Sequence, residues 1–346
     1  MELRKDAAWS LVAPTSMGVR LTPDDRQPVH VSDRFTLQAT SAESNVVSVS
    51  SHLGLPVKVL TNFVEGSPVS AFIKANLRSR GISYEGPDKP QGGAWGYRHQ
   101  FNIADAGFGG RAPRVWNDRA GEVGRDLDVS DFDTDRLFGA EGVRLLHLSG
   151  LIGALSPGSS RFCLDLARAA REHGTLVSFD LNYRASFWKG REQELAGVFA
   201  ELAAASDILI GNEEDFQLAL GIPGPQAGGR DLVGQLSGFE EMIDRVRARF
   251  GQARLFATTL REVVDANTHQ WGALVVDEDG SHVAEPRPIA VLDRIGGGDG
   301  FVGGLLYGLL REWPTQRALH FGWACGAYAA GSLTDYASPA DEDAVW

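Results

Sequence analysis

The segment "VLDRIGGGDGF" (residues 291–301) places three consecutive glycines directly before an aspartate, between two apolar runs. Glycines allow backbone N–H groups to approach a ligand closely, and a helix that begins at this junction would direct its positive end at an anion. Asp299 would repel that anion, so its presence predicts a chemical role. We expect the glycine N–H groups to stabilise charge on a transferred phosphoryl group while Asp299 accepts a proton from the attacking hydroxyl. A helix-capping aspartate, worth about 1 kcal/mol, is the structural alternative, and it explains only one of the four residues.

The chain before this segment alternates short apolar runs with amphipathic stretches. The predicted strands are 143–150, 175–182, 206–212, 253–260 and 272–280, and the predicted helices among them are 160–174, 191–205 and 213–221. Strands separated by helices of this length are joined by right-handed crossovers. The pattern therefore predicts an α/β fold with a mainly parallel sheet covered by helices on both faces.

The N-terminal third has a different pattern. Helices are expected at 41–54 and 68–81, with a strand between them at 56–63. Two polar, aromatic-rich stretches, roughly 11–38 and 92–122, lack helical periodicity and alternate weakly, as the strands of a small exposed sheet would. We interpret these stretches as a β flap over one edge of the main sheet, within a single domain that spans residues 1–346.

Composition limits the class of protein. The chain of 346 residues is 43% hydrophobic and carries a net charge of −12, which argues against nucleic-acid or membrane-surface binding. Cys163 and Cys325 are the only cysteines, so a disulfide framework is not predicted and a reducing cytoplasm fits. No apolar run is as long as a membrane span, and "MELRKDAAWSLVAP" lacks the apolar region of a signal peptide. We expect a cytoplasmic enzyme or binding protein.

Polar clusters follow several of the predicted strands. They are "NYR" (182–184), "NEED" (212–215), "TTLRE" (258–262) and "GGGD" (296–299). In open parallel sheets the ligand lies at the carboxyl ends of the strands, so these clusters are expected to meet in one site.

One common nucleotide-binding motif has a match in this chain, and another has none. "GDGFVG" (298–303) matches G-x-G-x-x-G, which would favour a dehydrogenase. The residues after it predict two consecutive helices, 299–311 and 314–331, and no strand that could complete a βαβ unit. A Walker A sequence is absent, so phosphates must be held in another way.

The segment "DRIGGGDGF" (293–301) resembles the C-terminal signature D-x-[TV]-G-A-G-D-x-F of the ribokinase-like (PfkB) carbohydrate kinases. Three further segments resemble the 2-keto-3-deoxygluconate kinase branch of that family: "FDLNYRASFW" (179–188), "IGNEEDF" (210–216) and "TTLRE". Residues 33–55 stand where the family has "YGGAEANVA", and residues 17–23 stand in the place of its opening strand. The resemblance covers nearly the whole chain and implies a ribokinase-like fold with a β-sheet lid.

The resemblance also implies roles for individual residues. Catalysis falls to Asp299 with the anion hole of Gly296, Gly297 and Gly298; acceptor binding to Arg184, Arg119, Thr40, Ser41, Asn45 and Asn117; nucleotide binding to Asn212, Thr259 and Arg261; and metal binding to Asp215 and Glu214. The implied cofactors are ATP and Mg²⁺, with a monovalent cation left open, and the implied assembly is a homodimer through the flap. Guanidinium groups bind carboxylates as paired donors, so the two acceptor-site arginines fit a sugar acid.

The sugar side departs from the family pattern. Thr40 and Ser41 replace paired glycines, Asn117 replaces a tyrosine, and the acidic residue of the opening strand is replaced near Ser16. These changes predict a kinase with an altered acceptor. The best single expectation is phosphorylation of a primary hydroxyl of 2-keto-3-deoxygluconate. A kinase for another sugar, such as fructose or tagatose, and a catalytically silent sugar- or nucleotide-binding relative remain alternatives.

Overall fold

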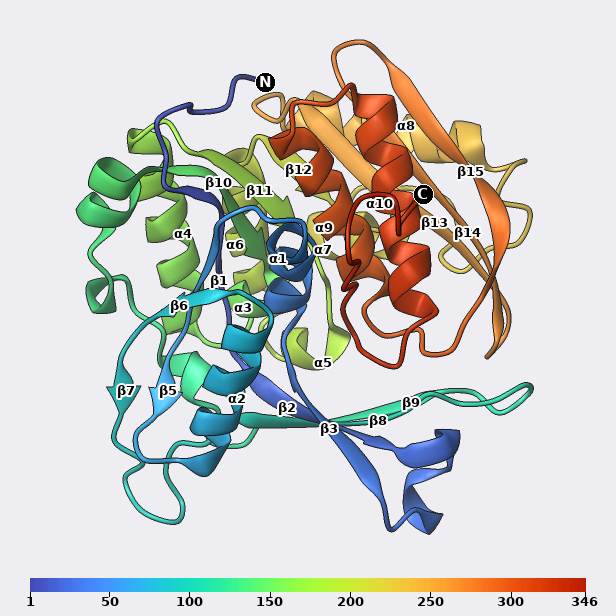
Figure 1. Cartoon of the computed structure of the whole chain (residues 1–346). Helices are drawn as coiled ribbons and strands as arrows, with labels where there is room; N and C mark the ends of the chain where they lie inside the picture. The colour runs from blue at the N-terminus through green and yellow to red at the C-terminus, as the bar shows by residue number, and fades with distance from the viewer.

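The computed structural model describes residues 1–346, and a nine-stranded sheet forms its centre (Figure 1). The strand order is β15-β14-β13-β12-β11-β10-β1-β4-β6, with parallel pairing from β13 to β6 and antiparallel pairing among β13, β14 and β15. The strands are β1 (Trp9–Pro14), β4 (Val57–Leu60), β6 (Ser83–Glu85), β10 (Val143–Ser149), β11 (Leu176–Asp180), β12 (Ile208–Ile210), β13 (Leu255–Asp265), β14 (Thr268–Val276) and β15 (Ser281–Ala290). The predicted mainly parallel sheet is confirmed.

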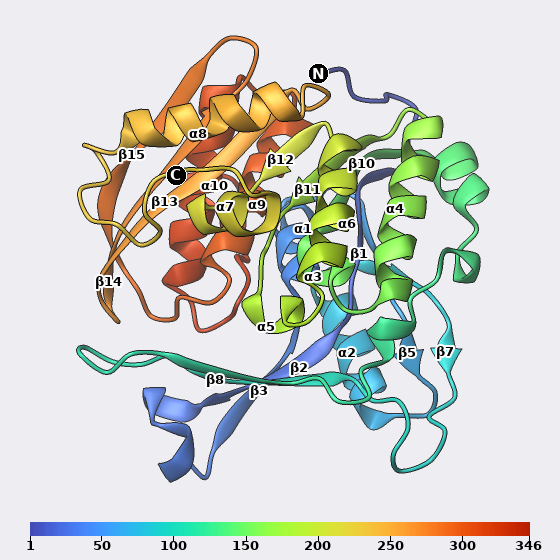
Figure 2. The ribbon, with the colours of Figure 1, turned by 180° about the vertical axis from the view of Figure 1, so that it is seen from behind.

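Helices cover both faces of this sheet. Figure 1 shows α1, α9 and α10 on the near face, and Figure 2 shows α4, α6, α7 and α8 on the far face. The helices are α1 (Ala42–His52), α2 (Pro68–Ser79), α3 (Gly150–Gly153), α4 (Pro157–Glu172), α5 (Ala185–Trp188), α6 (Glu192–Ala204), α7 (Glu213–Leu220), α8 (Leu236–Arg249), α9 (Gly297–Leu310) and α10 (Thr315–Ala330). Short 3₁₀ or π segments lie at Asp24–Arg26, Val29–Val31, Val123–Asp126, Val129–Asp131 and Asp135–Gly142. No helix is long and apolar enough to cross a membrane.

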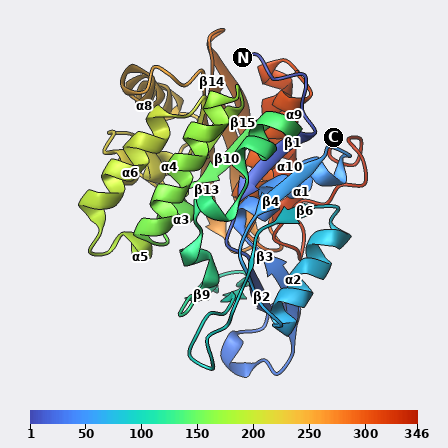
Figure 3. The same cartoon turned by 90° about the vertical axis from the view of Figure 1, so that its left-hand side faces the viewer.

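A second, four-stranded sheet forms the flap and projects from the main body, as the side view shows (Figure 3). Its strand order is β3-β2-β8-β9, and its strands are β2 (Gly18–Pro23), β3 (Phe35–Thr40), β8 (Gln100–Asp105) and β9 (Arg114–Asp118). A two-stranded sheet pairs β5 (Phe63–Val64) with β7 (Asp88–Lys89). The flap strands come from the two stretches predicted to form it.

Two boundaries differ from the prediction. The flap does not include residues 11–14, because these belong to β1 in the middle of the main sheet, where Leu11, Val12 and Ala13 are fully buried. Residues 17–23 therefore form a flap strand and not the opening strand. "TTLRE" is not a loop after a strand, because β13 continues to Asp265 and pairs along this length with β14.

Candidate active site

The glycine segment forms the first turn of α9. Gly296 precedes the helix with a φ of 85°, and a Cβ at this position would lie 1.9 Å from the carbonyl oxygen of Asp335, so only glycine fits. At Gly298 a Cβ would meet no atom within 4 Å, which indicates open space beside the helix start. The N–H groups of Gly297, Gly298 and Asp299 have no acceptor within the helix and donate to no other backbone group. The turn therefore presents free donors suited to an anion.

Asp299 lies in the same turn, half-buried. Its Oδ2 accepts a hydrogen bond from the Asn45 side-chain amide at 2.9 Å. Desolvation raises the pKa of Asp299 to about 7; the Asn45 hydrogen bond opposes this shift, and the nearby charges of Asp335 and Glu43 add to it. A carboxylate that titrates near neutral pH has the properties of a general base.

Two further carboxylates lie near Asp299. Asp180 ends β11, and desolvation together with the charges of Asp215 and Asp299 raises its pKa well above the ordinary value. Desolvation also raises the pKa of Asp215 to about 6. Arg184 lowers the pKa of all three carboxyl groups, so its guanidinium lies within their field. Its side chain is exposed, and it donates to the Tyr183 carbonyl oxygen at 2.7 Å.

Asn212 and Asp215, which the resemblance assigns to phosphate and metal, form the N-terminal capping box of α7. The Asp215 carboxylate accepts the N–H groups of Asn212 and Tyr183, each at 2.9 Å, and therefore also ties the segment after β11 to this helix. Glu214 is exposed on the first turn. No group of three or more His, Cys, Asp or Glu side chains is arranged to hold a metal ion. Magnesium held mainly by phosphate oxygens and one or two carboxylates needs no such cage.

Thr259 and Arg261 lie on β13, opposite Ala273 and Trp271 of β14. Arg261 is exposed, and partial desolvation together with the charge of Arg294, from the glycine segment, lowers its pKa. Two guanidinium groups that repel each other are both stabilised by an anion that binds between them.

The predicted sugar-side residues divide into three groups. Thr40 donates to the carboxylate of Asp335, and Asn45 donates to Asp299, so both lie at the centre of the site. The Ser41 hydroxyl is occupied as the cap of α1, where it accepts the Ser44 N–H at 3.1 Å. Asn117 is exposed on β9.

Arg119 follows β9 and is mostly buried. Its Nη1 donates to Glu122 Oε1 at 2.6 Å, and its guanidinium lies 5.1 Å from the centre of the Phe187 ring. The same Glu122 oxygen accepts the Ser16 hydroxyl at 2.5 Å. Ser16, where the sequence lacks the expected acid, thus contacts a carboxylate from elsewhere in the chain.

The sequence reasoning missed several acidic residues of this site. They are Glu43, Glu122, Asp180, Asp293 and Asp335. Asp180 could have been found, because it lies near the end of the predicted strand 175–182, two residues before the "NYR" cluster. Glu122 and Asp335 reach the site through contacts more than a hundred residues apart in the chain, for which a single sequence carries no signal.

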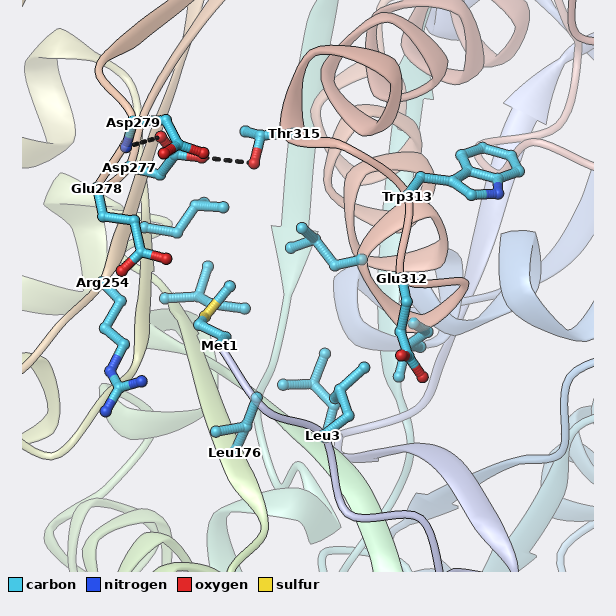
Figure 4. A pocket seen from close by; sticks show the side chains of 15 residues that line it. Met1, Leu3, Leu176, Arg254, Asp277, Glu278, Asp279, Glu312, Trp313 and Thr315 are labelled. Atoms are coloured by element: carbon cyan, nitrogen blue, oxygen red, sulfur yellow. Dashed lines mark hydrogen bonds between the residues drawn. The ribbon is translucent and has the colours of Figure 1, made fainter.

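A cavity of about 230 Å³ lies elsewhere, among residues that begin the parallel strands and end α9 (Figure 4). Leu176, Met1 and Trp313 line its apolar part, and Asp279 and Glu312 lie on its rim. None of the predicted site residues lines it, so this cavity is separate from the candidate site.

The chain is similar in sequence to carbohydrate kinases. The sequence model described as pfkB family carbohydrate kinase matches residues 138–341. A 5-dehydro-2-deoxygluconokinase from Clostridium perfringens is 29% identical over 215 residues, which are 62% of this chain and 56% of that protein, so the match spans little more than half of that relative's length. A 2-dehydro-3-deoxygalactonokinase from Haloferax volcanii is 27% identical over 317 residues, covering 89% of this chain and 87% of that protein.

Solved structures share the fold. A 2-dehydro-3-deoxygluconokinase from Thermotoga maritima superposes with a TM-score of 0.87 at 25% identity over 97% of both chains. An E. coli protein described as a ribokinase II, in complex with ATP and Mg²⁺, superposes with a TM-score of 0.74 at 15% identity over 97% of both chains, which shows a common fold. Since the family model covers more than half of the sequence and the ribokinase-like fold agrees with it, this chain belongs to the pfkB family of carbohydrate kinases.

Proposed function

We propose that this kinase transfers the γ-phosphoryl group of ATP to a primary hydroxyl of a sugar or keto sugar acid, with Asp299 as the general base. The observation that carries the proposal is the position of Asp299. A carboxyl group with a pKa near 7 lies in the same helical turn as free backbone N–H donors. A base and an anion hole in one turn are the two parts that phosphoryl transfer to a hydroxyl requires.

In this mechanism the acceptor hydroxyl donates its proton to Asp299 as its oxygen bonds to the γ-phosphorus. The bond from that phosphorus to the bridging oxygen of ADP breaks, and ADP leaves with the bonding electrons. The N–H groups of Gly297, Gly298 and Asp299 supply partial positive charge to the phosphoryl oxygens. Closure of the flap over the acceptor would exclude water, which otherwise competes as the nucleophile.

The residues present fit a magnesium nucleotide. Arg261 and Arg294 offer guanidinium groups to phosphate oxygens, and a cation would stabilise the ionised forms of Asp180 and Asp215, whose pKa values desolvation raises. When bound, Mg²⁺ neutralises charge on the transferred phosphate. Asn212 and Thr259 remain proposed phosphate-binding residues, Glu214 remains a proposed metal ligand, and a monovalent cation remains open.

The first acceptor to test is 2-keto-3-deoxygluconate. The sequence resembles that branch of the family, and the two named relatives above are kinases of deoxygenated keto sugar acids. Neutral sugars should be tested beside it, because Arg119 already donates to the carboxylate of Glu122.

The test is ADP release from Mg-ATP across a panel of hexoses, pentoses, ketoses and keto sugar acids, with the wild type and Asp299→Asn in parallel. We expect turnover with at least one acceptor and a loss of about 10²-fold or more in the variant, the range of a general base. Calorimetric titration with ATP is the control, because Asp299→Asn keeps the size of the side chain and should still bind nucleotide.

A wild type that binds ATP and sugars without phosphorylating any of them would favour the catalytically silent relative. Equal turnover by wild type and Asp299→Asn would support the kinase activity but reject Asp299 as the general base.

We also propose a homodimer joined through the flap and a cytoplasmic location. Both cysteines are unpaired and buried, which fits a reducing compartment. The support for the dimer is the outer face of the flap, where the apolar side chains of Leu37 and Trp116 are exposed.

A further inference from the structure

The Arg119 guanidinium already has a carboxylate partner within the chain. The side chain of Glu122 is 1% exposed and that of Arg119 is 16% exposed, so water screens this pair poorly. The Ser16 hydroxyl and the Arg119 Nη1 both donate to Glu122 Oε1, which fixes the carboxylate from two sides. A substrate carboxylate at Arg119 would therefore meet the charge of Glu122 as well as the guanidinium.

The other unpaired polar atoms around Asp299 are mainly acceptors. Four buried oxygens have no hydrogen-bond partner: Glu43 Oε1, Asn45 Oδ1, Glu122 Oε2 and Asp335 Oδ1. Asn45 contacts Asp299, Asp335 accepts from Thr40 beside the glycine turn, and the charge of Arg119 acts on Glu43. Buried acceptors without donors are costly, and the group that relieves them must itself donate.

Functional groups of possible acceptors differ in this respect. A hydroxyl both donates and accepts, whereas an ionised carboxylate only accepts. A carboxylate at Arg119 could donate to none of the four oxygens, unlike the hydroxyl that takes its place in a neutral sugar, and it would add negative charge beside Glu122. Beside Glu122, the unpaired buried donor is Arg119 Nε, against the four unpaired acceptor oxygens.

We propose that Glu122 determines the class of acceptor: by occupying Arg119, it selects a neutral polyhydroxy sugar and disfavours a sugar acid. This inference rests on the proposed kinase function and narrows its acceptor. It assigns to Glu122 a specificity role through Arg119, distinct from the chemical role of Asp299.

The test compares pairs of acceptors that differ only at C1. Fructose and 2-keto-gluconate share every carbon from C2 to C6, and 3-deoxyfructose and 2-keto-3-deoxygluconate form the corresponding 3-deoxy pair. For the wild type we expect kcat/KM to favour the neutral member by about tenfold or more, since juxtaposed like charges discriminate strongly in a buried site. If the preferred acceptor is another sugar, it is compared with its own acid oxidised at the terminal carbon.

The variant is Glu122→Gln, which keeps the shape of the side chain and removes its charge. We expect it to lower the preference for the neutral member by about tenfold, mainly through a lower KM for the acid. Glu194→Gln is the matched control, because Glu194 forms the same i,i+3 pair with Arg191, at 2.6 Å, outside the site. The control should leave the ratio unchanged.

A wild type that prefers the acid member of each pair overturns the inference, and so does a Glu122→Gln variant that folds normally with an unchanged ratio. If Glu122→Gln fails to fold, the ratio of the wild-type kcat/KM values for the neutral and the acid acceptor decides whether the inference holds. Absence of turnover that depends on Asp299, with any acceptor, is a different result, because it rejects the proposed function and not only its acceptor class.

Discussion

At the scale of single residues, the three glycines before Asp299 are not equivalent. Gly296 has a left-handed φ and no room for a Cβ, so Gly296→Ala should destabilise the protein by about 2 kcal/mol or more. Gly298 faces open space, so Gly298→Ala should leave the melting temperature unchanged or slightly higher. It should nevertheless lower kcat by about tenfold or more, because a methyl group would enter the space proposed for the phosphoryl group. Thermal unfolding and ADP release, measured on both variants, separate the two roles.

Equal loss of stability in both variants would contradict this division. Full activity of Gly298→Ala would instead show that the phosphoryl group does not bind beside Gly298.

The pKa of Asp299 predicts a dependence of activity on pH. In the free enzyme kcat/KM should rise about tenfold per pH unit in acid and level off above about pH 7, since the base must be ionised. The Asn45 amide lowers this pKa, so Asn45→Ala should move the rise to higher pH. A pH–rate profile of the wild type and Asn45→Ala measures both effects, and identical profiles would mean that Asp299 does not control the acid limb.

The same group predicts a dependence of stability on pH. Its folded pKa lies above the unfolded value, so the folded protein binds more protons, and stability falls as pH rises from about 4 to about 7. Asp299→Asn should therefore be more stable than the wild type at pH 8, with a gain in melting temperature of about 2–4 °C for each kcal/mol relieved. Unfolding at pH 5 is the control, since the advantage should be smaller there. An Asp299→Asn variant that is less stable at both pH values would contradict the raised pKa.

Single residues also show where sequence reasoning ends. The helix start at the glycines, with Asp299 in its first turn, could be predicted because it lies within one short segment, and the chemical role of Asp299 stays a prediction. Asn45, Thr40 and Arg119 came from a resemblance, and the structure joins the first two directly to Asp299 and Asp335. The partner of Arg119 could not be predicted, since any of many acidic residues could have supplied that carboxylate.

At the scale of elements, patterns predicted helices and strands well where one face or both faces are buried. The strand that ends in Asp180 and the helix that begins after Asn212 are examples, because apolar runs and capping residues mark them locally. The pattern misplaced β1 and the end of β13. In both cases pairing with a neighbouring strand, and not local composition, decides which sheet the residues join and how far the strand extends.

The flap strand β2 is attached to the main body by a buried ion pair. Arg20 contacts Asp293, which begins the glycine segment, and their side chains are 0% and 3% exposed. Asp293 also accepts the N–H of Ile295 at 3.0 Å, so this carboxylate connects the flap to the loop before α9. One side chain, that of Asp293, therefore contacts both the flap strand and the glycine segment.

Removing the cation should leave a buried charge without compensation. We expect Arg20→Met to lower the free energy of unfolding by about 3–5 kcal/mol. The control is Arg34→Met, whose partner Asp25 lies 3.8 Å away, with both side chains more than 70% exposed, and which should change stability by about 0.5 kcal/mol or less. Urea unfolding measures both. Similar small changes in the free energy of unfolding of the two variants would show that Asp293 is protonated in the variant or that water solvates its charge.

At the scale of the whole molecule, the outer face of the flap has no cover. Cross-strand pairing aligns Leu37, Leu21, Ile103 and Trp116 in one row across all four strands. Side chains alternate between the faces of a strand, so this row points away from the side on which Arg20 meets Asp293. Leu37 is 53% exposed and Trp116 is 72% exposed. Figure 1 shows that these strands project from the body, where a second flap could pack against them.

An apolar row on a projecting sheet is expected to be buried against a partner, and the proposed partner is a second copy of this chain. Light scattering after gel filtration should give twice the chain mass of 37.3 kDa. Leu37→Glu combined with Trp116→Glu should give the monomer, because each charge would face an apolar surface. Val233→Glu, at an equally exposed apolar residue outside the flap, should leave the dimer intact. A monomeric wild type would contradict the proposal, and a dimer that survives both flap substitutions would place its interface elsewhere.

The monomer should also bind the acceptor more weakly than the dimer does, because β9 ends beside Arg119. Steady-state kinetics of the monomeric variant should show KM raised more than kcat is lowered.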